Sequence, residues 1–176
     1  VLNIITADSD NSIAIGKVLC ASPTVRKVTF TGSTPVGRIL MQQSASSIKK
    51  MSLELGGHAP FIVFEDADID AAIDGAMISK YRNAGQTCVC TNRFYVHAKV
   101  YDTFVEKLAA RVAGTLAVGE GFEDKVTTGP LIDDAAIAKV QEHVQDAIAK
   151  GAKVVTGGAA HSRGGRFYQP TVLSNI

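Results

Sequence analysis

The order of the apolar runs along the chain is the feature that most constrains its fold. Before Gly57, short strand-like runs alternate with segments whose apolar residues recur at helical spacing; the runs are residues 2–5, 27–31 and 51–55, and the helical segments are 11–20 and 36–40. Strands connected through helices in this way pair in parallel, because each helix returns the chain to the end where the previous strand began. The alternation over residues 1–57 therefore predicts part of a doubly wound parallel sheet in an α/β fold.

The remaining residues continue the alternation and predict a second α/β unit over 58–176. Strand patterns occur at residues 60–64, 93–96, 154–155 and 167–173, and helical spacing occurs at 69–80, 101–112 and 137–148. Aspartates stand where N-caps are needed: Asp10 before the first helix of the chain, and Asp66 and Asp68 before the helix at 69–80.

Composition and charge narrow the class of protein. A formal net charge of +1 over 176 residues gives no reason to expect a nucleic-acid or membrane partner. Three cysteines, two of them separated by a single residue, do not make a disulfide framework, so a reducing, cytoplasmic setting is expected. No group of metal-ligating residues stands out. The strand-like runs beside Val1 and Ile176 indicate an internal portion of a longer chain.

The polar stretch from Asn83 to Cys90 is the first candidate site. Gly85 can adopt positive φ and end the preceding helix, and a strand pattern resumes at Arg93. The turn between them would hold Cys88 outside regular structure. A thiol placed there is a candidate nucleophile, because thiolate attacks carbonyl groups well. The alternative is a small buried hydrophobe, as most free cysteines are.

Residues 30–37 form a second candidate, a glycine turn between a strand and a helix. Pro35 sits in the first helical turn, where proline is tolerated best. Free backbone N–H groups and the positive end of the helix dipole make such a turn a natural anion site. The spacing is not G-x-G-x-x-G, so an ordinary strand-to-helix turn is an equal alternative.

Glu54 is anomalous in its apolar strand, which ends in the pair Gly56-Gly57. A carboxylate in that position must be paired, exposed at an edge, or functional. Ligands of open α/β sheets bind beyond the carboxyl ends of the strands, and Glu54 lies near such an end. His58 follows, and a lone histidine after a turn is more often solvated or structurally satisfied than a ligand.

Taken in order, the motifs FTGSTPVG, LELGG and NAGQTC resemble the aldehyde dehydrogenase superfamily. The flanking YRNAGQTCVCTNR and TTGPLID are most similar to its succinate-semialdehyde branch. The resemblance implies that residues 1–57 are the C-terminal part of a dinucleotide-binding domain. It implies that residues 58–176 are the N-terminal part of a catalytic domain. It further implies NAD or NADP as cofactor, without deciding between them, a small aldehyde as substrate, and a homo-oligomeric full-length enzyme.

Family roles can be carried over to matching positions. Cys88 matches the nucleophile, Glu54 matches the general base, and Arg82 matches the group that holds a substrate carboxylate. The turn that holds the cofactor is matched by Gly32, Ser33, Thr34 and Gly37. Leu55 matches a position near the nicotinamide amide. Succinate semialdehyde would then be oxidised through a Cys88 thiohemiacetal and a thioester hydrolysed with Glu54 as base. Glutarate semialdehyde and other carboxylate-bearing aldehydes fit the same pattern.

Two further readings stay open. A CoA-acylating enzyme would transfer the acyl group to a thiol, and Glu54 counts against it. A non-catalytic protein of the same fold is the other, and the presence of Cys88 and Glu54 disfavours it. The family's oxyanion asparagine and adenosine-binding strands would precede Val1, and its distal cofactor contacts and oligomerisation strand would follow Ile176. The 176-residue chain alone is therefore expected to show no turnover.

Cys90 lies two residues from the candidate nucleophile. That separation makes it a candidate redox partner able to capture an oxidised Cys88 sulfur. The alternative is a packing cysteine, because so short a disulfide ring is strained.

Overall fold

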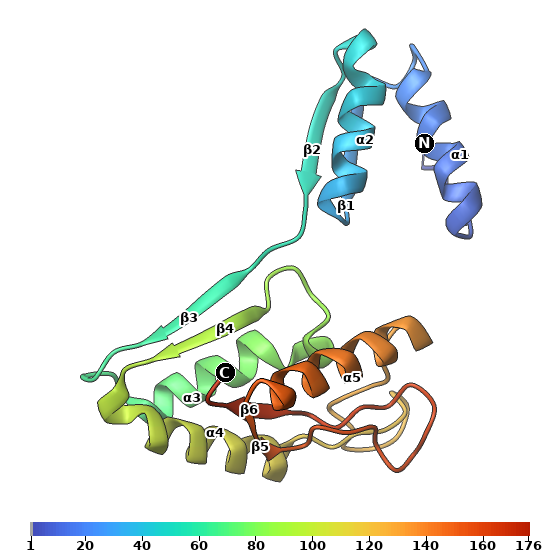
Figure 1. The fold of residues 1–176 in the computed structure, drawn as a ribbon. Coiled ribbons are helices and arrows are strands. Elements are labelled where there is room, and N and C mark those ends of the chain that lie inside the picture. Colours follow the sequence, from blue (N-terminus) through green and yellow to red (C-terminus); the bar gives the residue numbers. More distant parts are fainter. Residues whose placement is uncertain (1) are drawn as a thin grey trace. The chain divides into compact units, whose positions relative to one another are not determined.

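The structure, a computed structural model, describes residues 2–176 and divides into two compact units, Val1–Gly57 and His58–Ile176. Figure 1 labels the helices and strands of both units. The first unit consists of α1 (Ser9–Ala21), β1 (Lys27–Thr31), α2 (Thr34–Ser44), the short 3₁₀ turn η1 (Ala45–Ser47) and β2 (Lys50–Glu54). The mixture of helices and strands predicted from the sequence is confirmed.

The strands β1 and β2 pair in parallel, as their connection through a helix predicts. Val28 lies opposite Met51, and Thr31 lies opposite Glu54. The prediction of a strand at residues 2–5 is wrong, because these residues have no regular structure and α1 follows them. A strand exists only where a neighbouring strand accepts its backbone hydrogen bonds, and an apolar run does not reveal whether such a partner is present.

Side-chain caps set where the two helices of this unit begin. The Asp8 carboxylate accepts a hydrogen bond from the Asn11 N–H at 2.8 Å, so α1 begins earlier than the expected cap at Asp10 would allow. The Ser33 hydroxyl accepts from the Val36 N–H at 3.4 Å and begins α2, with proline in its first turn. The glycine turn therefore leads straight into a capped helix.

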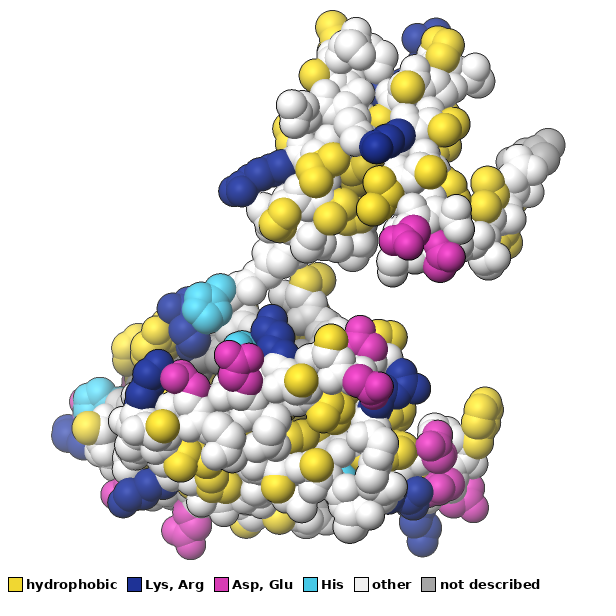
Figure 2. All heavy atoms as spheres, turned by 45° about the vertical axis from the view of Figure 1, so that its right-hand side comes forward, with side chains coloured by type: hydrophobic (Ala, Val, Ile, Leu, Met, Phe, Trp, Pro, Cys, Tyr) yellow, Lys and Arg dark blue, Asp and Glu magenta, His cyan; other side chains and the backbone are white. Residues whose placement is uncertain are grey.

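Most apolar side chains of the first unit lie at its surface. Cys20 is the one hydrophobic side chain in residues 2–57 that is fully buried. Large apolar residues of both helices are exposed: Ile13, Val18, Leu19, Val36, Ile39 and Met41. Figure 2 shows apolar side chains spread over the surface of this unit. Its helices and strands therefore bury little apolar area by themselves.

The second unit consists of two small sheets and three longer helices. Its elements are β3 (Ala59–Val63), α3 (Ile69–Lys80), the 3₁₀ turn η2 (Arg82–Gly85), β4 (Thr91–Val96), η3 (Ala98–Val100), α4 (Tyr101–Thr115), α5 (Asp134–Ala149), β5 (Lys153–Thr156) and β6 (Val172–Ser174). The pair β3–β4 is parallel, with Phe61 opposite Phe94, whereas β5–β6 is antiparallel. Asp68 caps α3 by accepting from the Ala71 N–H at 3.1 Å.

A single core joins β3, α3, α4 and β6. Its buried members are Val63, Ile73, Ala76, Phe104, Leu108, Val112 and Val172. The rings of Phe61, Phe94 and Phe104 pack in sequence with centroid separations of 5.2 and 6.2 Å, which ties the sheet to α4. A smaller cluster of Leu131, Val144 and Tyr168 lies beneath α5. These two clusters hold the end of α3, from which the candidate nucleophile's turn departs.

The prediction of one strand over residues 167–173 is wrong in its extent. Only Val172–Ser174 forms a strand, and Tyr168 makes an isolated bridge with Ala160. Pro170 lies between them and has no N–H to donate to a neighbouring strand. The proline therefore interrupts a run that is otherwise strand-like in composition.

Candidate functional site

The carboxyl end of the β1–β2 sheet brings the glycine turn and Glu54 together. The Gly32 N–H donates to the Glu54 carbonyl oxygen at 3.0 Å, directly beyond the last paired residues of the two strands. One residue later, Leu55 packs on the first turn of α2. A Cβ added at Gly37 would lie 2.8 Å from Leu55 Cδ2, so the absence of a side chain at Gly37 permits this close contact.

The first turn of α2 retains backbone donors suited to an anion. Ser33 Oγ already accepts from the Val36 N–H, and the Ser33 carbonyl accepts from the Gly37 N–H. Within the described part of the chain, the N–H groups of Ser33 and Thr34 pair with no other backbone group. No acidic residue stands in this turn. Free donors at the positive end of an eleven-residue helix fit a phosphate group.

The Glu54 side chain is exposed at this edge. Its carboxylate forms no hydrogen bond or ion pair with any residue from 2 to 176. Of the environments expected for a carboxylate at the end of an apolar strand, the paired one is therefore wrong.

Cys88 lies in an irregular turn between α3 and β4, and its side chain is exposed. Helix α3 ends at Lys80, earlier than Gly85 alone would suggest. The chain then reverses through three successive residues in the left-handed region, Asn83 at φ 52°, Ala84 at φ 54° and Gly85 at φ 76°. The alternative of a buried hydrophobe is thus wrong for Cys88, whose sulfur is open to a ligand.

Two side-chain amides brace this turn. Asn83 Nδ2 donates to the Gln86 carbonyl at 3.3 Å, and Gln86 Nε2 donates back to the Asn83 carbonyl at 3.2 Å. Gln86 Oε1 also accepts from the Ile132 N–H at 2.9 Å, although Ile132 lies 46 residues further along the chain. Sequence reasoning did not single out Gln86. Its place in the NAGQTC motif, two residues before Cys88, was the only signal, and this place indicates nothing about the distant partner Ile132.

Arg82 and Cys90 stand on either side of the nucleophile's turn in different surroundings. Arg82 is exposed, lies beyond the end of α3, and makes no ion pair within residues 2–176. Lys80 is the basic residue in the last turn of α3, and Arg82 is the basic residue in the last turn of η2. Cys90 is buried at 2% exposure, with its Sγ 2.8 Å from Thr87 Oγ1 and 3.7 Å from the Lys80 carbonyl.

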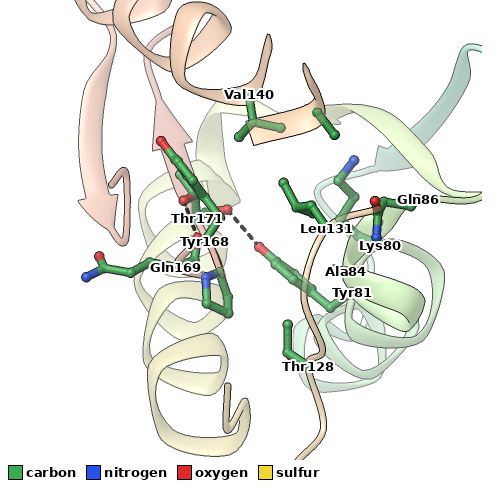
Figure 3. Close-up of a pocket in the computed structure, with 13 residues that line it drawn as sticks. Lys80, Tyr81, Ala84, Gln86, Thr128, Leu131, Val140, Tyr168, Gln169 and Thr171 are labelled. Atoms are coloured by element: carbon green, nitrogen blue, oxygen red, sulfur yellow. Dashed lines mark hydrogen bonds between the residues drawn. The ribbon is translucent and has the colours of Figure 1, made fainter. Parts of the chain in front are cut away.

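A cavity of about 290 Å³ lies behind the turn, between the end of α3, α5 and the segment Tyr168–Thr171 (Figure 3). Tyr81 reaches across it and donates from its hydroxyl to the Thr171 carbonyl at 3.1 Å. Burial raises the pKa of Tyr81 above its ordinary value, so the hydroxyl stays protonated and keeps this bond. Neither Cys88 nor Arg82 lines the cavity.

No helix within residues 2–176 is both long and apolar enough to span a bilayer. No three His, Cys, Asp or Glu side chains gather there as ligands for a metal ion. The sequence-predicted residues form two groups: Glu54 and Leu55 beside the glycine turn in the first unit, and Arg82, Cys88 and Cys90 within one segment of the second.

Comparison with known proteins agrees with these features. Residues 1–176 match the Aldehyde dehydrogenase family throughout. The chain is 57% identical over 176 residues to the succinate-semialdehyde dehydrogenase [NADP(+)] GabD of Escherichia coli K12, covering all of this chain and 36% of that protein. It is 62% identical over 162 residues to the glutarate-semialdehyde dehydrogenase of Pseudomonas aeruginosa, covering 92% of this chain and 33% of that protein.

A solved structure of a relative has a similar fold. The crystal structure of succinate-semialdehyde dehydrogenase from Burkholderia pseudomallei superposes with a TM-score of 0.92 at 57% identity, covering 98% of this chain and 35% of that one. The chain thus spans about a third of the length of the relatives it matches. The resemblance carried by the three motifs is confirmed, and the chain belongs to the aldehyde dehydrogenase family.

Proposed function

We propose that this chain supplies the nucleophile, the general base and the substrate-carboxylate contact of an NAD- or NADP-dependent semialdehyde dehydrogenase. The exposed Cys88 thiol in its braced turn, six residues after an exposed and unpaired Arg82, carries the proposal. Succinate semialdehyde is the proposed substrate and succinate the product. The identity to a succinate-semialdehyde dehydrogenase supports this choice.

Cys88 begins the reaction. Its thiolate adds to the aldehyde carbon, and the carbonyl electron pair moves to oxygen to give a thiohemiacetal oxyanion. The Cys88 backbone N–H has no backbone partner among the described residues, so it is free to donate to that oxygen. The braced turn keeps both the sulfur and this N–H on a short and ordered piece of chain.

Residues of the first unit would hold the cofactor and finish the reaction. The free N–H groups of Ser33 and Thr34 fit a cofactor phosphate, and Gly32, Gly37 and Leu55 shape that edge. We therefore propose that residues 1–57 belong to a doubly wound dinucleotide-binding domain and residues 58–176 to the catalytic domain. A nicotinamide cofactor held there would supply the hydride acceptor needed to convert the Cys88 thiohemiacetal to a thioester. Glu54 then takes a proton from the water that attacks the thioester, and the acid departs as the thiol is regenerated.

Glutarate semialdehyde is the second candidate substrate. The Pseudomonas aeruginosa relative of that name shares 62% of 162 residues with this chain. The two substrates differ by one methylene group, and a guanidinium that grips the terminal carboxylate can serve both. The three unpaired cysteines support a reducing, cytoplasmic setting, and we propose a homo-oligomer for the full-length enzyme.

The proposal is tested with a chimera in which residues 1–176 replace the matching segment of the Escherichia coli relative. We expect the chimera to oxidise succinate and glutarate semialdehydes in preference to uncharged aldehydes of equal length, with NAD and NADP compared in parallel. Turnover should not depend on coenzyme A. A chimera that folds and binds cofactor but gives no thioester on Cys88 would refute the assignment, and product formation only with coenzyme A would favour the acylating alternative.

We also propose that Cys90 captures an oxidised Cys88. The Cys88 sulfenic acid would condense with the Cys90 thiol, forming the S–S bond and releasing water. Cys90 is buried beside Thr87, so the turn must open first, whereas a packing cysteine would never react. Peroxide-inactivated chimera should recover with dithiothreitol, and the Cys90→Ala variant should not. Equal recovery of both proteins, measured as aldehyde turnover, would leave Cys90 as a packing residue.

A further inference from the structure

We infer that Gln86 is the positioning residue of the nucleophile, because its side-chain amide locks the turn that presents Cys88 and ties that turn to Ile132. The inference deepens the proposed function and rests on it only where turnover is concerned. Gln86 lies two residues before Cys88 and bonds through both ends of its amide. No other side chain between Arg82 and Cys90 hydrogen-bonds to a residue beyond position 91.

The turn needs such a lock because its backbone is disfavoured. Residues with a Cβ rarely occupy the left-handed region, and here Asn83 and Ala84 do so in succession, followed by Gly85. An isolated chain would leave this conformation. The reciprocal amide bonds between Asn83 and Gln86 close the left-handed segment into a ring and oppose that relaxation.

The partner of Gln86 is itself held firmly. Arg166 Nη1 donates to the Ile132 carbonyl, and the Leu131 N–H donates to the Arg166 carbonyl at 2.8 Å. Leu131 is buried in the cluster beneath α5. The bond from Ile132 to Gln86 therefore connects the Cys88 turn to an anchored segment.

Packing alone supports the turn weakly on its inner side. Ala84, Gly85 and Gln86 form part of the wall of the 290 Å³ cavity, where Figure 3 shows Gln86 and Leu131 facing the same space. Atoms that border a cavity lack van der Waals partners on that side. Ala84 still touches the cluster beneath α5, so its small side chain and the Gln86 amide together hold the turn.

Hydrogen exchange on the 176-residue chain tests the lock without aldehyde or cofactor. In Gln86→Ala we expect two amides to exchange faster by about two- to tenfold. One is the Ile132 amide, which loses its acceptor. The other is the Cys90 amide, which does not bond to Gln86 but lies in the same turn. Amides of α3 and α4 should be unchanged. Gln141→Ala is the matched control, since Gln141 also bonds through its amide oxygen, to the Tyr168 hydroxyl at 3.2 Å. It should leave the Cys90 amide unaffected.

Two further variants keep the test decisive if Gln86→Ala folds poorly. Gln86→Glu keeps the acceptor for Ile132 but loses the donor to Asn83, so its Cys90 amide should exchange at an intermediate rate. Ala84→Gly removes a Cβ from the left-handed region, and added to Gln86→Ala it should restore part of the protection. Exchange that rises equally throughout the chain, or at Ile132 alone, overturns the inference.

Turnover in the chimera separates positioning from stability. Gln86→Ala should lower the rate constant of the first-turnover burst by about two- to tenfold for charged and uncharged aldehydes alike, while its amplitude per folded subunit is kept. A purely structural role would lower the amplitude per total subunit, because fewer subunits fold, and would spare the rate constant. If the unmodified chimera reduces no nicotinamide with either aldehyde, the proposed function fails, while the exchange result still decides the role of Gln86 in the turn.

Discussion

Glu54→Gln in the chimera is expected to leave the first turnover intact and to slow every later one by roughly 10²–10⁴-fold, the usual contribution of a general base. Thiohemiacetal formation needs the Cys88 sulfur and the oxyanion donor, and neither depends on a carboxylate. Thioester hydrolysis does depend on it, because water attacks an acyl group poorly without a base to take its proton. Glutamine keeps the size of the side chain at the exposed end of β2 and removes only the basic oxygen.

Rapid mixing with succinate semialdehyde provides the measurement. We expect one equivalent of reduced nicotinamide per active site, followed by a slow steady state, with the acyl group found on Cys88 by mass spectrometry. Glu142→Gln, an exposed carboxylate on α5, is the matched control for loss of one negative charge and should behave as the unchanged chimera. Disappearance of the burst would show that Glu54 acts before the thioester forms.

The sequence predicted the elements whose signal is local. Strand β1 occupies residues 27–31 as its β-branched and aromatic content indicated, and Asp68 caps α3 as expected. Both depend on residues within one turn or one strand. The strand expected at residues 2–5 failed because it required a partner that the pattern could not show, and Pro170 shortened β6 because one missing N–H outweighed an apolar run.

The candidate site likewise contains residues that the sequence revealed and features that it could not reveal. Motif order was enough to identify the family, and spacing marked Cys88 and Glu54 as unusual. The left-handed run at Asn83 and Ala84 was not predictable, because neither residue demands positive φ. The contact from Gln86 to Ile132 crosses 46 residues, and the cavity behind the turn is formed by four separate segments. Such features depend on tertiary packing, which local periodicity does not encode.

Arg82→Ala should lower kcat/KM for succinate semialdehyde by about tenfold to a hundredfold, because a charge-assisted hydrogen bond contributes about 1.5–3 kcal/mol. The structure leaves the guanidinium exposed, beyond the end of α3 and free of any ion pair within residues 2–176. A planar fork of donors in that state can bind a carboxylate through two parallel bonds. That contact would fix the far end of the substrate and leave its aldehyde carbon within reach of Cys88.

The measurement compares two aldehydes of equal length on the same variant, one with a terminal carboxylate and one uncharged. The uncharged aldehyde never makes the contact and should lose little, so any damage to folding or cofactor binding cancels in the ratio. Arg82→Lys sharpens the test, because lysine keeps the positive charge but not the two-bond geometry. Its kcat/KM for the carboxylate-bearing aldehyde should lie between the values for the unchanged chimera and for Arg82→Ala. Equal losses for both aldehydes would make Arg82 structural. The preference for carboxylate-bearing substrates would then need a different cation.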